Sequence, residues 1–83
     1  MKLEILTPEK TLYRGEIDSI TLPGAAGSFQ ILNNHAPIIA SLTKGMPTLT
    51  AGTIIKEMEV EDGFVEVHDN TITVCVETIE PKK

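Results

Sequence analysis

The sequence predicts an all-β protein, an antiparallel β-sandwich or flattened barrel of about eight to ten short strands. Two observations lead to this prediction. No stretch of about 10–12 residues repeats apolar side chains with the period of a helix, and turn-forming residues recur every 6–12 residues or so. The 83 residues are expected to form one domain, 1–83, whose core is modest because a chain of this size buries only about 60–65% of its unfolded surface.

The chain opens with a strand. Residues 2–6 alternate apolar and polar side chains, which is typical of a half-buried strand, and Thr7-Pro8 interrupts the pattern. Leu12-Tyr13 is a second short apolar segment, and we expect a turn at Arg14-Gly15 after it.

Residues 16–22 predict a further strand, although Ile17 is out of phase with the apolar residues after it. A β-bulge near Asp18-Ser19 would restore the phase. Pro23-Gly24 predicts a turn, and Gly27 is expected to extend that loop.

Residues 27–42 form two apolar runs separated by Asn33-Asn34 and His35-Ala36-Pro37. Asparagine tolerates left-handed backbone, and Pro37 lacks the amide hydrogen that a central ladder needs. The pattern therefore predicts two short strands joined by a rigid corner with a polar tip.

The next segment predicts a hairpin. Lys44-Gly45 is expected to turn, Pro47 to mark an edge or strand start, and residues 48–50 and 53–55 to pair across Ala51-Gly52.

The C-terminal part predicts three more features. Residues 57–61 alternate, with Met58 and Val60 facing inward between exposed glutamates. Asp62-Gly63 is the strongest hairpin signal in the chain, and a turn at 68–70 precedes a last strand over 71–77. The polar end 80–83 is expected to fray.

Composition excludes several functions. The net charge of −5, from 7 basic and 12 acidic side chains, repels phosphate backbones, and the aromatics Tyr13, Phe29 and Phe64 are too few for a base-stacking platform, so nucleic-acid binding is not expected. The lone Cys75 precludes an internal disulfide and favours a reducing cytoplasmic setting. No signal peptide or membrane span is evident, so we expect any membrane association to come through partners.

No constellation of residues indicates catalysis or metal binding. His35, His68 and Cys75 lack the close ligand pairs of a zinc site. The serines are not in a strained nucleophile turn, and the glycines at 24–27 lack the lysine and helix of a phosphate loop. We therefore expect no enzymatic activity, no cofactor and no metal.

Five short fragments carry a family resemblance and keep the family's order and spacing. They are 6–10 (LTPEK), 15–24 (GEIDSITLPG), 27–37 (GSFQILNNHAP), 44–46 (KGM), and 61–67 with 70–74 (EDGFVEV, NTITV). Together they resemble the N-terminal domain of the epsilon subunit of bacterial F-type ATP synthase, which is called delta in mitochondria.

The resemblance implies a β-sandwich on the central stalk of a rotary motor, peripheral on the cytoplasmic side of the bacterial membrane. Such a subunit holds gamma to the ring of c subunits beneath the catalytic F1 head and does no chemistry itself. The resemblance implies one set of residues facing the c ring, namely Ser28, Phe29, Gln30, Ile31, Asn33, Asn34 and His35. It implies a second set facing gamma, namely Thr7, His35 and Ala40.

The chain also departs from the family it resembles. Ser28 occupies a position where many relatives have glutamate, Gln30 replaces a common glycine, and Asn33-Asn34 replaces Pro-Gly. Typical members continue into a C-terminal helical hairpin that can bind ATP, whereas nothing helical is predicted after Val76 here. We therefore expect no nucleotide binding and no inhibition by such a hairpin.

Two other classes of function stay open. Residues 53–58 faintly resemble the modified-lysine hairpin of biotinyl or lipoyl carrier domains, although Lys56 lacks the expected neighbours. A free-standing binding module with an unknown ligand is the third possibility.

Overall fold

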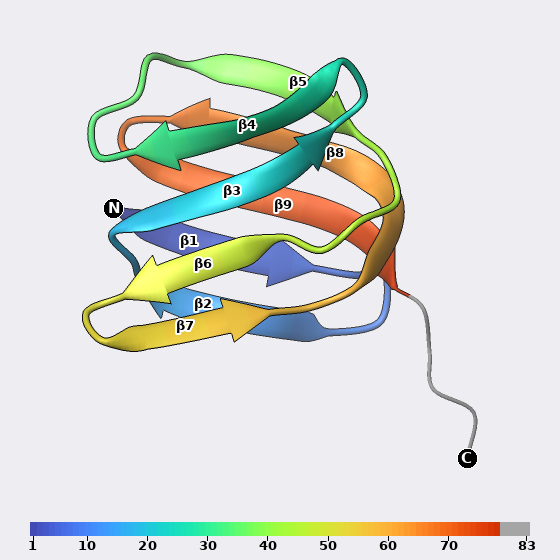
Figure 1. The fold of residues 1–83 in the computed structure, drawn as a ribbon, viewed down its shortest axis with the longest axis horizontal. Helices are drawn as coiled ribbons and strands as arrows, with labels where there is room; N and C mark the ends of the chain where they lie inside the picture. The colour runs from blue at the N-terminus through green and yellow to red at the C-terminus, as the bar shows by residue number, and fades with distance from the viewer. Residues whose placement is uncertain (79–83) are drawn as a thin grey trace.

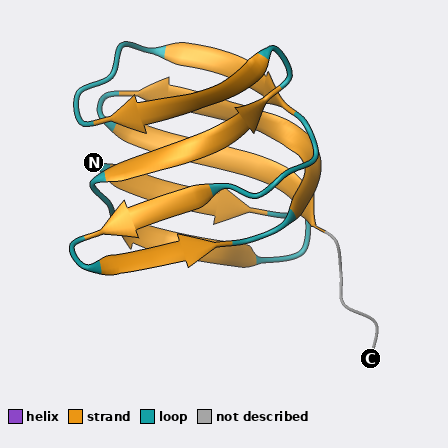
Figure 2. Ribbon diagram, viewed as in Figure 1, coloured by secondary structure: helices purple, strands orange, loops and turns teal. Residues whose placement is uncertain are grey.

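The computed structural model describes residues 1–78, which form nine strands and, within that range, no helix (Figures 1 and 2). No described segment is therefore a helix that could cross a membrane. The strands are β1 (Lys2–Leu6), β2 (Thr11–Glu16), β3 (Ser19–Gly24), β4 (Gly27–Leu32), β5 (Ile38–Leu42), β6 (Thr48–Ala51), β7 (Ile54–Glu57), β8 (Val60–His68) and β9 (Thr71–Thr78). The polar end predicted to fray, 80–83, lies outside the described residues.

The strands form one curled sheet in the order β2-β1-β9-β8-β5-β3-β6-β7, with β4 added to β3. In Figure 1 the layer of β3, β4, β6 and β7 lies in front of β1, β2, β8 and β9. This arrangement confirms the predicted sandwich or flattened barrel. One ladder departs from the antiparallel expectation, because β1 runs parallel to β9.

The core lies between the two layers, and strand alternation builds it. Inward positions of β1, β3, β8 and β9 are buried while their neighbours face outward. The buried apolar residues are Met1, Leu3, Ile5, Ile17, Ile20, Leu22, Ile31, Leu42, Leu49, Val60, Val65, Val67, Ile72, Val74 and Val76. No buried residue of the described range is polar or charged, so the interior is filled by apolar side chains.

Several predicted elements are confirmed. The strand at 2–6 is β1, the corner joins β4 to β5, the hairpin is β6–β7, and the last strand is β9. The β6–β7 turn lies one residue later than expected, at Gly52-Thr53, where Gly52 has a φ of 64°. A left-handed residue of this kind is usually glycine.

Two predicted turns are wrong. Arg14-Gly15 lies inside β2, where Gly15 pairs with Leu3 across an edge ladder. Pro23-Gly24 ends β3, and the turn follows at Ala25-Ala26. Pro23 has no N–H to donate to a ladder, but its carbonyl accepts a hydrogen bond from the N–H of Thr43 (2.8 Å).

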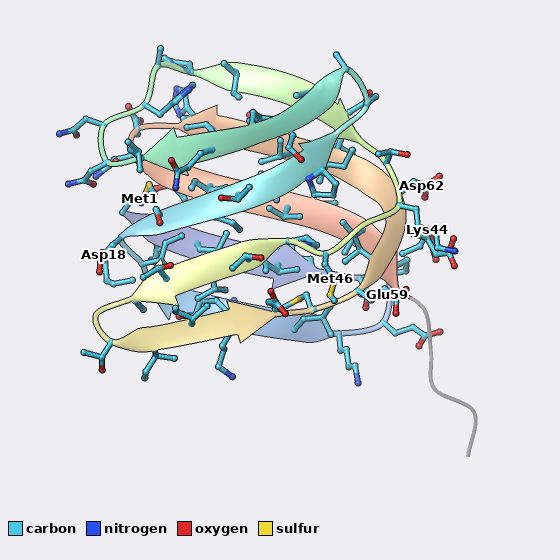
Figure 3. The ribbon with its side chains drawn as sticks, viewed as in Figure 1. Met1, Asp18, Lys44, Met46, Glu59 and Asp62 are labelled. Carbon is cyan, nitrogen blue, oxygen red and sulfur yellow. The ribbon has the colours of Figure 1, made fainter. Side chains whose placement is uncertain are left out.

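The predicted bulge at Asp18-Ser19 is also wrong, because the chain leaves β2 before that point and re-enters the sheet at Ser19. Ile17 lies in this connection and is buried (3% exposed) despite being out of phase. Asp18, at the end of the sandwich in Figure 3, accepts a hydrogen bond from the N–H of Gly52 (2.8 Å). The residue therefore secures the neighbouring β6–β7 turn.

The alternating run over 57–61 is not one strand, because β7 ends at Glu57 and β8 begins at Val60. Met58 lies between them, and its N–H donates to the carbonyl of Pro47 (3.3 Å). The inward positions are nevertheless as expected, since Met58 is half-buried and Val60 is fully buried.

Asp62-Gly63 is a β-bulge inside β8, so the predicted hairpin there is wrong. Val60 pairs with Thr78 and Gly63 with Val76, which leaves one more residue on β8 than on β9. A bulge bends its strand, and β8 curves at this side of the sandwich (Figure 1). Asp62-Gly63 thus lets one strand pass from one layer to the other without ending.

Candidate functional site

The described residues present two exposed surfaces that a partner could cover. Over residues 1–78 no three His, Cys, Asp or Glu side chains are grouped as a metal site would require. The ring of His35 is engaged within its own corner, where its Nδ1 lies 2.7 Å from the carbonyl oxygen of Ala36.

The first surface, which we call the β4 rim, is the exposed edge of β4 and the corner after it. Among the described strands β4 pairs with β3 alone. Successive side chains of a strand point to opposite faces, so the residues of β4 that were expected to face the c ring fall into an exposed set and a wholly or partly buried set. Ser28 and Gln30 are exposed, whereas Phe29 is half-buried and Ile31 is completely buried. Phe29 and Ile31 therefore anchor the rim to the core and leave their neighbours as its contact surface.

The corner completes the β4 rim. Asn33 and Asn34 are exposed and His35 is half-buried. Asn33 comes five positions after Ser28, and in a strand this separation spans about 17 Å. The residues predicted to share one corner thus form an extended edge along one side of the sandwich, next to β5 (Figure 1).

Sequence reasoning missed Leu32 on this rim, whose side chain is 53% exposed. Leu32 pairs with Ser19 and Ile31 with Ile20. Because paired residues lie on the same face of the sheet and Ile20 is completely buried, the register of the β3–β4 hairpin determines which of the two apolar neighbours, Ile31 or Leu32, faces inward.

The residues assigned to a gamma subunit do not form one cluster. Thr7 follows β1 and His35 follows β4, at opposite ends of the sandwich (Figure 1). The hydroxyl of Thr7 accepts a hydrogen bond from the N–H of Lys10 (3.1 Å), which closes the β1–β2 loop. Ala40 is half-buried and packs against the core from β5.

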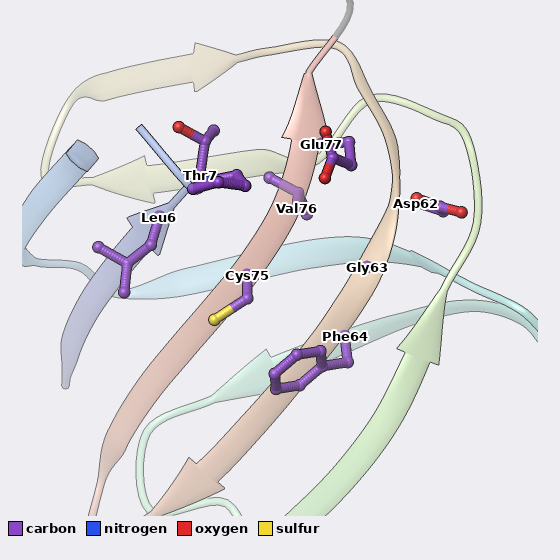
Figure 4. Close-up of a pocket in the computed structure, with 9 residues that line it drawn as sticks. Leu6, Thr7, Asp62, Gly63, Phe64, Cys75, Val76 and Glu77 are labelled. Carbon is purple, nitrogen blue, oxygen red and sulfur yellow. The ribbon is translucent and has the colours of Figure 1, made fainter. Parts of the chain in front are cut away.

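The second surface, which we call the outer groove, is an apolar depression of about 420 Å³ beside Thr7 (Figure 4). Leu6 and Phe64 both pair with Cys75, so three adjacent strands present one row of apolar side chains outward. Phe64 is 46% exposed. The groove is lined by Leu6, Thr7, Pro8, Asp62, Gly63, Phe64, Cys75, Val76 and Glu77.

Sequence reasoning did not single out the outer groove. Its lining comes from the loop after β1, the bulge of β8 and the end of β9. Outward apolar residues at Leu6 and Phe64 were the available signal, but their adjacency depends on a parallel β1–β9 ladder that periodicity does not reveal.

Exposed apolar side chains also occur elsewhere. Ile39 on β5 is 76% exposed and pairs with Glu66. Ile54 and Ile55 on β7 are 57% and 67% exposed, and β7 ends the strand order of the sheet. These side chains do not line the outer groove.

Comparison with known sequences identifies the family. Residues 1–82 match the family model described as the β-sandwich domain of the ATP synthase delta/epsilon chain. The ATP synthase epsilon chain of Leptospira borgpetersenii is 43% identical over 77 residues, covering 93% of this chain and 61% of the relative. That of Syntrophomonas wolfei is 43% identical over 79 residues, covering 94% and 58%. The chain thus spans about 60% of the length of these relatives.

Solved structures share the fold at low sequence identity. A chain from the central stalk and c ring of the mitochondrial ATP synthase of Tetrahymena thermophila superposes with a TM-score of 0.80 at 22% identity, covering 92% of this chain and 62% of that one. A chain of the Euglena gracilis mitochondrial ATP synthase gives 0.84 at 17% identity, covering 89% and 48%. With the family match, this agreement of fold leads to one conclusion: the chain belongs to the ATP synthase delta/epsilon family and represents its β-sandwich domain.

Proposed function

We propose that this protein is a non-catalytic rotor component of a bacterial F-type ATP synthase that holds a gamma subunit to the ring of c subunits. The observation that carries the proposal is the outer groove, where Leu6, Cys75 and Phe64 form an apolar row open to solvent. A surface of this kind is typical of a lasting protein interface. Family membership and the bacterial relatives support the choice of complex.

Gamma is the partner that we assign to the outer groove. Thr7, one of the residues expected to face gamma, lines the groove directly. Ala40 is placed to support this contact from within the sheet, since it packs on the core opposite Val65 of β8. His35 lies at the opposite end of the sandwich from Thr7, so its contact with gamma would be separate from the outer groove.

The c ring is the partner that we assign to the β4 rim. Its exposed polar members Ser28, Gln30, Asn33 and Asn34 are uncharged, and Leu32 adds one exposed apolar side chain. A mainly polar surface of this kind suits contact with hydrated loops at a wet interface. Phe29 and Ile31 keep the edge attached to the core. In this assignment the protein reaches the cytoplasmic face of the membrane only through its partners, and the F1 head only through gamma.

Mechanical coupling demands a stiff body between the two surfaces. The ladders β5–β8 and β8–β9 link the strand next to the rim with strands that line the groove. Buried apolar side chains fill the space between the layers, and close-packed interiors transmit strain because they are only weakly compressible. Torque applied at one surface would therefore reach the other with little deformation.

The carrier-domain alternative has less support. A modified lysine in such domains stands at the tip of a hairpin, but Lys56 lies inside β7 and pairs with Leu49. The β6–β7 tip is Gly52-Thr53. Nothing in the described structure favours Lys56 as an attachment site.

Replacing Gln30 with arginine is expected to weaken binding to the c ring at least about tenfold while binding to gamma is retained. The added bulk and charge would stand where the loops of the ring approach, and misplaced interfacial charge commonly costs more than 1.4 kcal/mol. Co-purification of c subunits and gamma with the full chain, from detergent-solubilised membranes, measures both interactions. Thr53→Arg, in the exposed β6–β7 turn, is the matched control. If Gln30→Arg and Thr53→Arg weakened binding to the c ring equally, the assignment of the β4 rim to the ring would be contradicted.

A further inference from the structure

One side chain joins two turns that are far apart in the sequence. Asn70 lies in the β8–β9 turn, and Asn33-Asn34 lies in the corner after β4. The Oδ1 of Asn70 accepts a hydrogen bond from the backbone N–H of Asn34 (2.8 Å). Its Nδ2 donates to the Oδ1 of Asn33 (3.1 Å). A single carboxamide therefore contacts both asparagines of the corner through its two ends.

The backbone at Asn70 would favour a different residue. Asp69 and Asn70 have φ values of 52° and 58°, two consecutive left-handed residues in a tight hairpin turn. Glycine adopts this conformation without steric cost, whereas asparagine is only tolerated there. The turn itself does not need an amide side chain, so the two hydrogen bonds to the corner are its distinctive contribution.

The corner in turn relies on this contact. Asn34 is also left-handed, with a φ of 64°, and its N–H is bonded to a side chain of another turn. The neighbouring His35 ring is held locally by the carbonyl of Ala36. Asn70 thus connects the end of the β4 rim to the β8–β9 hairpin through two hydrogen bonds.

We propose that Asn70 is a positioning residue, which fixes Asn33, Asn34 and His35 in the shape that meets the c ring without contacting the ring itself. The inference rests on the proposed function for the identity of the partner. The two hydrogen bonds between Asn70 and the corner, which we call the clamp, do not depend on which partner the corner meets. Loss of the clamp would leave the hairpin folded and loosen only the corner.

Asn70→Gly is the decisive variant because glycine removes the clamp and relieves the left-handed backbone. Amide hydrogen exchange at Asn34, followed by NMR on the full chain, should accelerate about fivefold or more, as expected for the loss of one hydrogen bond. Asp69→Gly is the matched control, since it relieves the adjacent left-handed residue and leaves the clamp intact. In Asp69→Gly, the hydrogen-exchange rate of the Asn34 amide should equal that of the unaltered protein. Unchanged Asn34 exchange in Asn70→Gly would overturn the inference.

A conservative variant separates positioning from general stability. Asn70→Asp keeps an oxygen that can accept from Asn34 and should retain most of the protection of that amide. The thermal midpoint should be similar in Asn70→Gly and Asp69→Gly. If the Asn34 amide exchanged as fast in Asn70→Asp as in Asn70→Gly, the hydrogen bond from the N–H of Asn34 to the side chain of residue 70 would have no role in holding the corner.

Binding to the c ring distinguishes failure of this inference from failure of the proposed function. We expect Asn70→Gly to weaken c-subunit co-purification several-fold and Asp69→Gly to leave it unchanged. If Gln30→Arg weakens ring binding and Asn70→Gly does not, the positioning role is wrong although the rim assignment stands. If neither variant affects ring binding, the assignment of the rim to the ring is wrong.

Discussion

Replacing Gly63 with alanine is expected to lower the free energy of unfolding by about 3 kcal/mol, at the upper end of the usual range for overpacking. A Cβ at this position would overlap the carbonyl oxygen of Cys75 and lie 2.8 Å from the Cα of Val76. Both obstacles are backbone atoms of β9, so no side chain can rotate away. The bulged segment of β8 would have to separate from β9, at the point where β8 passes between the layers.

Thermal and urea unfolding of the full chain measure this effect. A loss of about 3 kcal/mol corresponds to a fall in Tm of roughly 12–24 °C for a domain of this size. Gly15→Ala is the matched control, because a Cβ there lies at an ordinary contact distance of 3.4 Å from the Tyr13 hydroxyl oxygen. That substitution should be neutral or should stabilise by up to about 1 kcal/mol. If Gly63→Ala and Gly15→Ala had similar unfolding midpoints, β9 would be able to move away from the bulge at little cost in free energy, and the prediction would be wrong.

Gly63 also shows where sequence reasoning succeeds and where it fails. Alternation of apolar residues correctly predicted β1 and β9, because burial on one face imposes a period of two. The two apolar runs on either side of the corner correctly predicted β4 and β5. Glycine and proline were less informative. Pro23-Gly24, Arg14-Gly15 and Asp62-Gly63 were all predicted as turns, and all three lie in strands.

The physical reason is that glycine serves two purposes that look alike in a sequence. It permits left-handed backbone, as at Gly52 in the β6–β7 turn, and it permits close approach of another chain segment, as at Gly63. The first purpose depends on local conformation. The second depends on a neighbour that is distant in sequence, so the residues around Asp62-Gly63 could not distinguish a bulge from a hairpin.

The two candidate surfaces differ in the same way. The β4 rim is nearly continuous in sequence, so a fragment such as 28–35 could suggest it, although only the structure separates exposed Gln30 from buried Ile31. The outer groove needs Leu6, Cys75 and Phe64 to be adjacent. Leu6 and Cys75 meet through a parallel ladder between the first and last strands, a pairing that local patterns do not specify.

Replacing Phe64 with glutamate is expected to weaken the affinity for the cognate gamma subunit at least about 30-fold. A buried phenylalanine covers on the order of 200 Å², so covering the 46% of the side chain that is exposed removes about 90 Å² from water and contributes about 2 kcal/mol. Glutamate forfeits this contribution and places a carboxylate between Leu6 and Cys75. The Kd can be measured by isothermal titration of purified gamma into the full chain.

Ile55→Glu is the matched control for Phe64→Glu. Ile55 is more exposed than Phe64, at 67% against 46%, and lies on β7, which does not line the outer groove. Both substitutions place a carboxylate on an exposed strand position, so both should change the free energy of unfolding by less than about 1 kcal/mol. A difference in gamma affinity between the two variants would therefore report the location of the interface and not the integrity of the fold. If Ile55→Glu alone abolished binding, gamma would dock on the β7 edge, and the row formed by Leu6, Cys75 and Phe64 would have to be assigned to another partner.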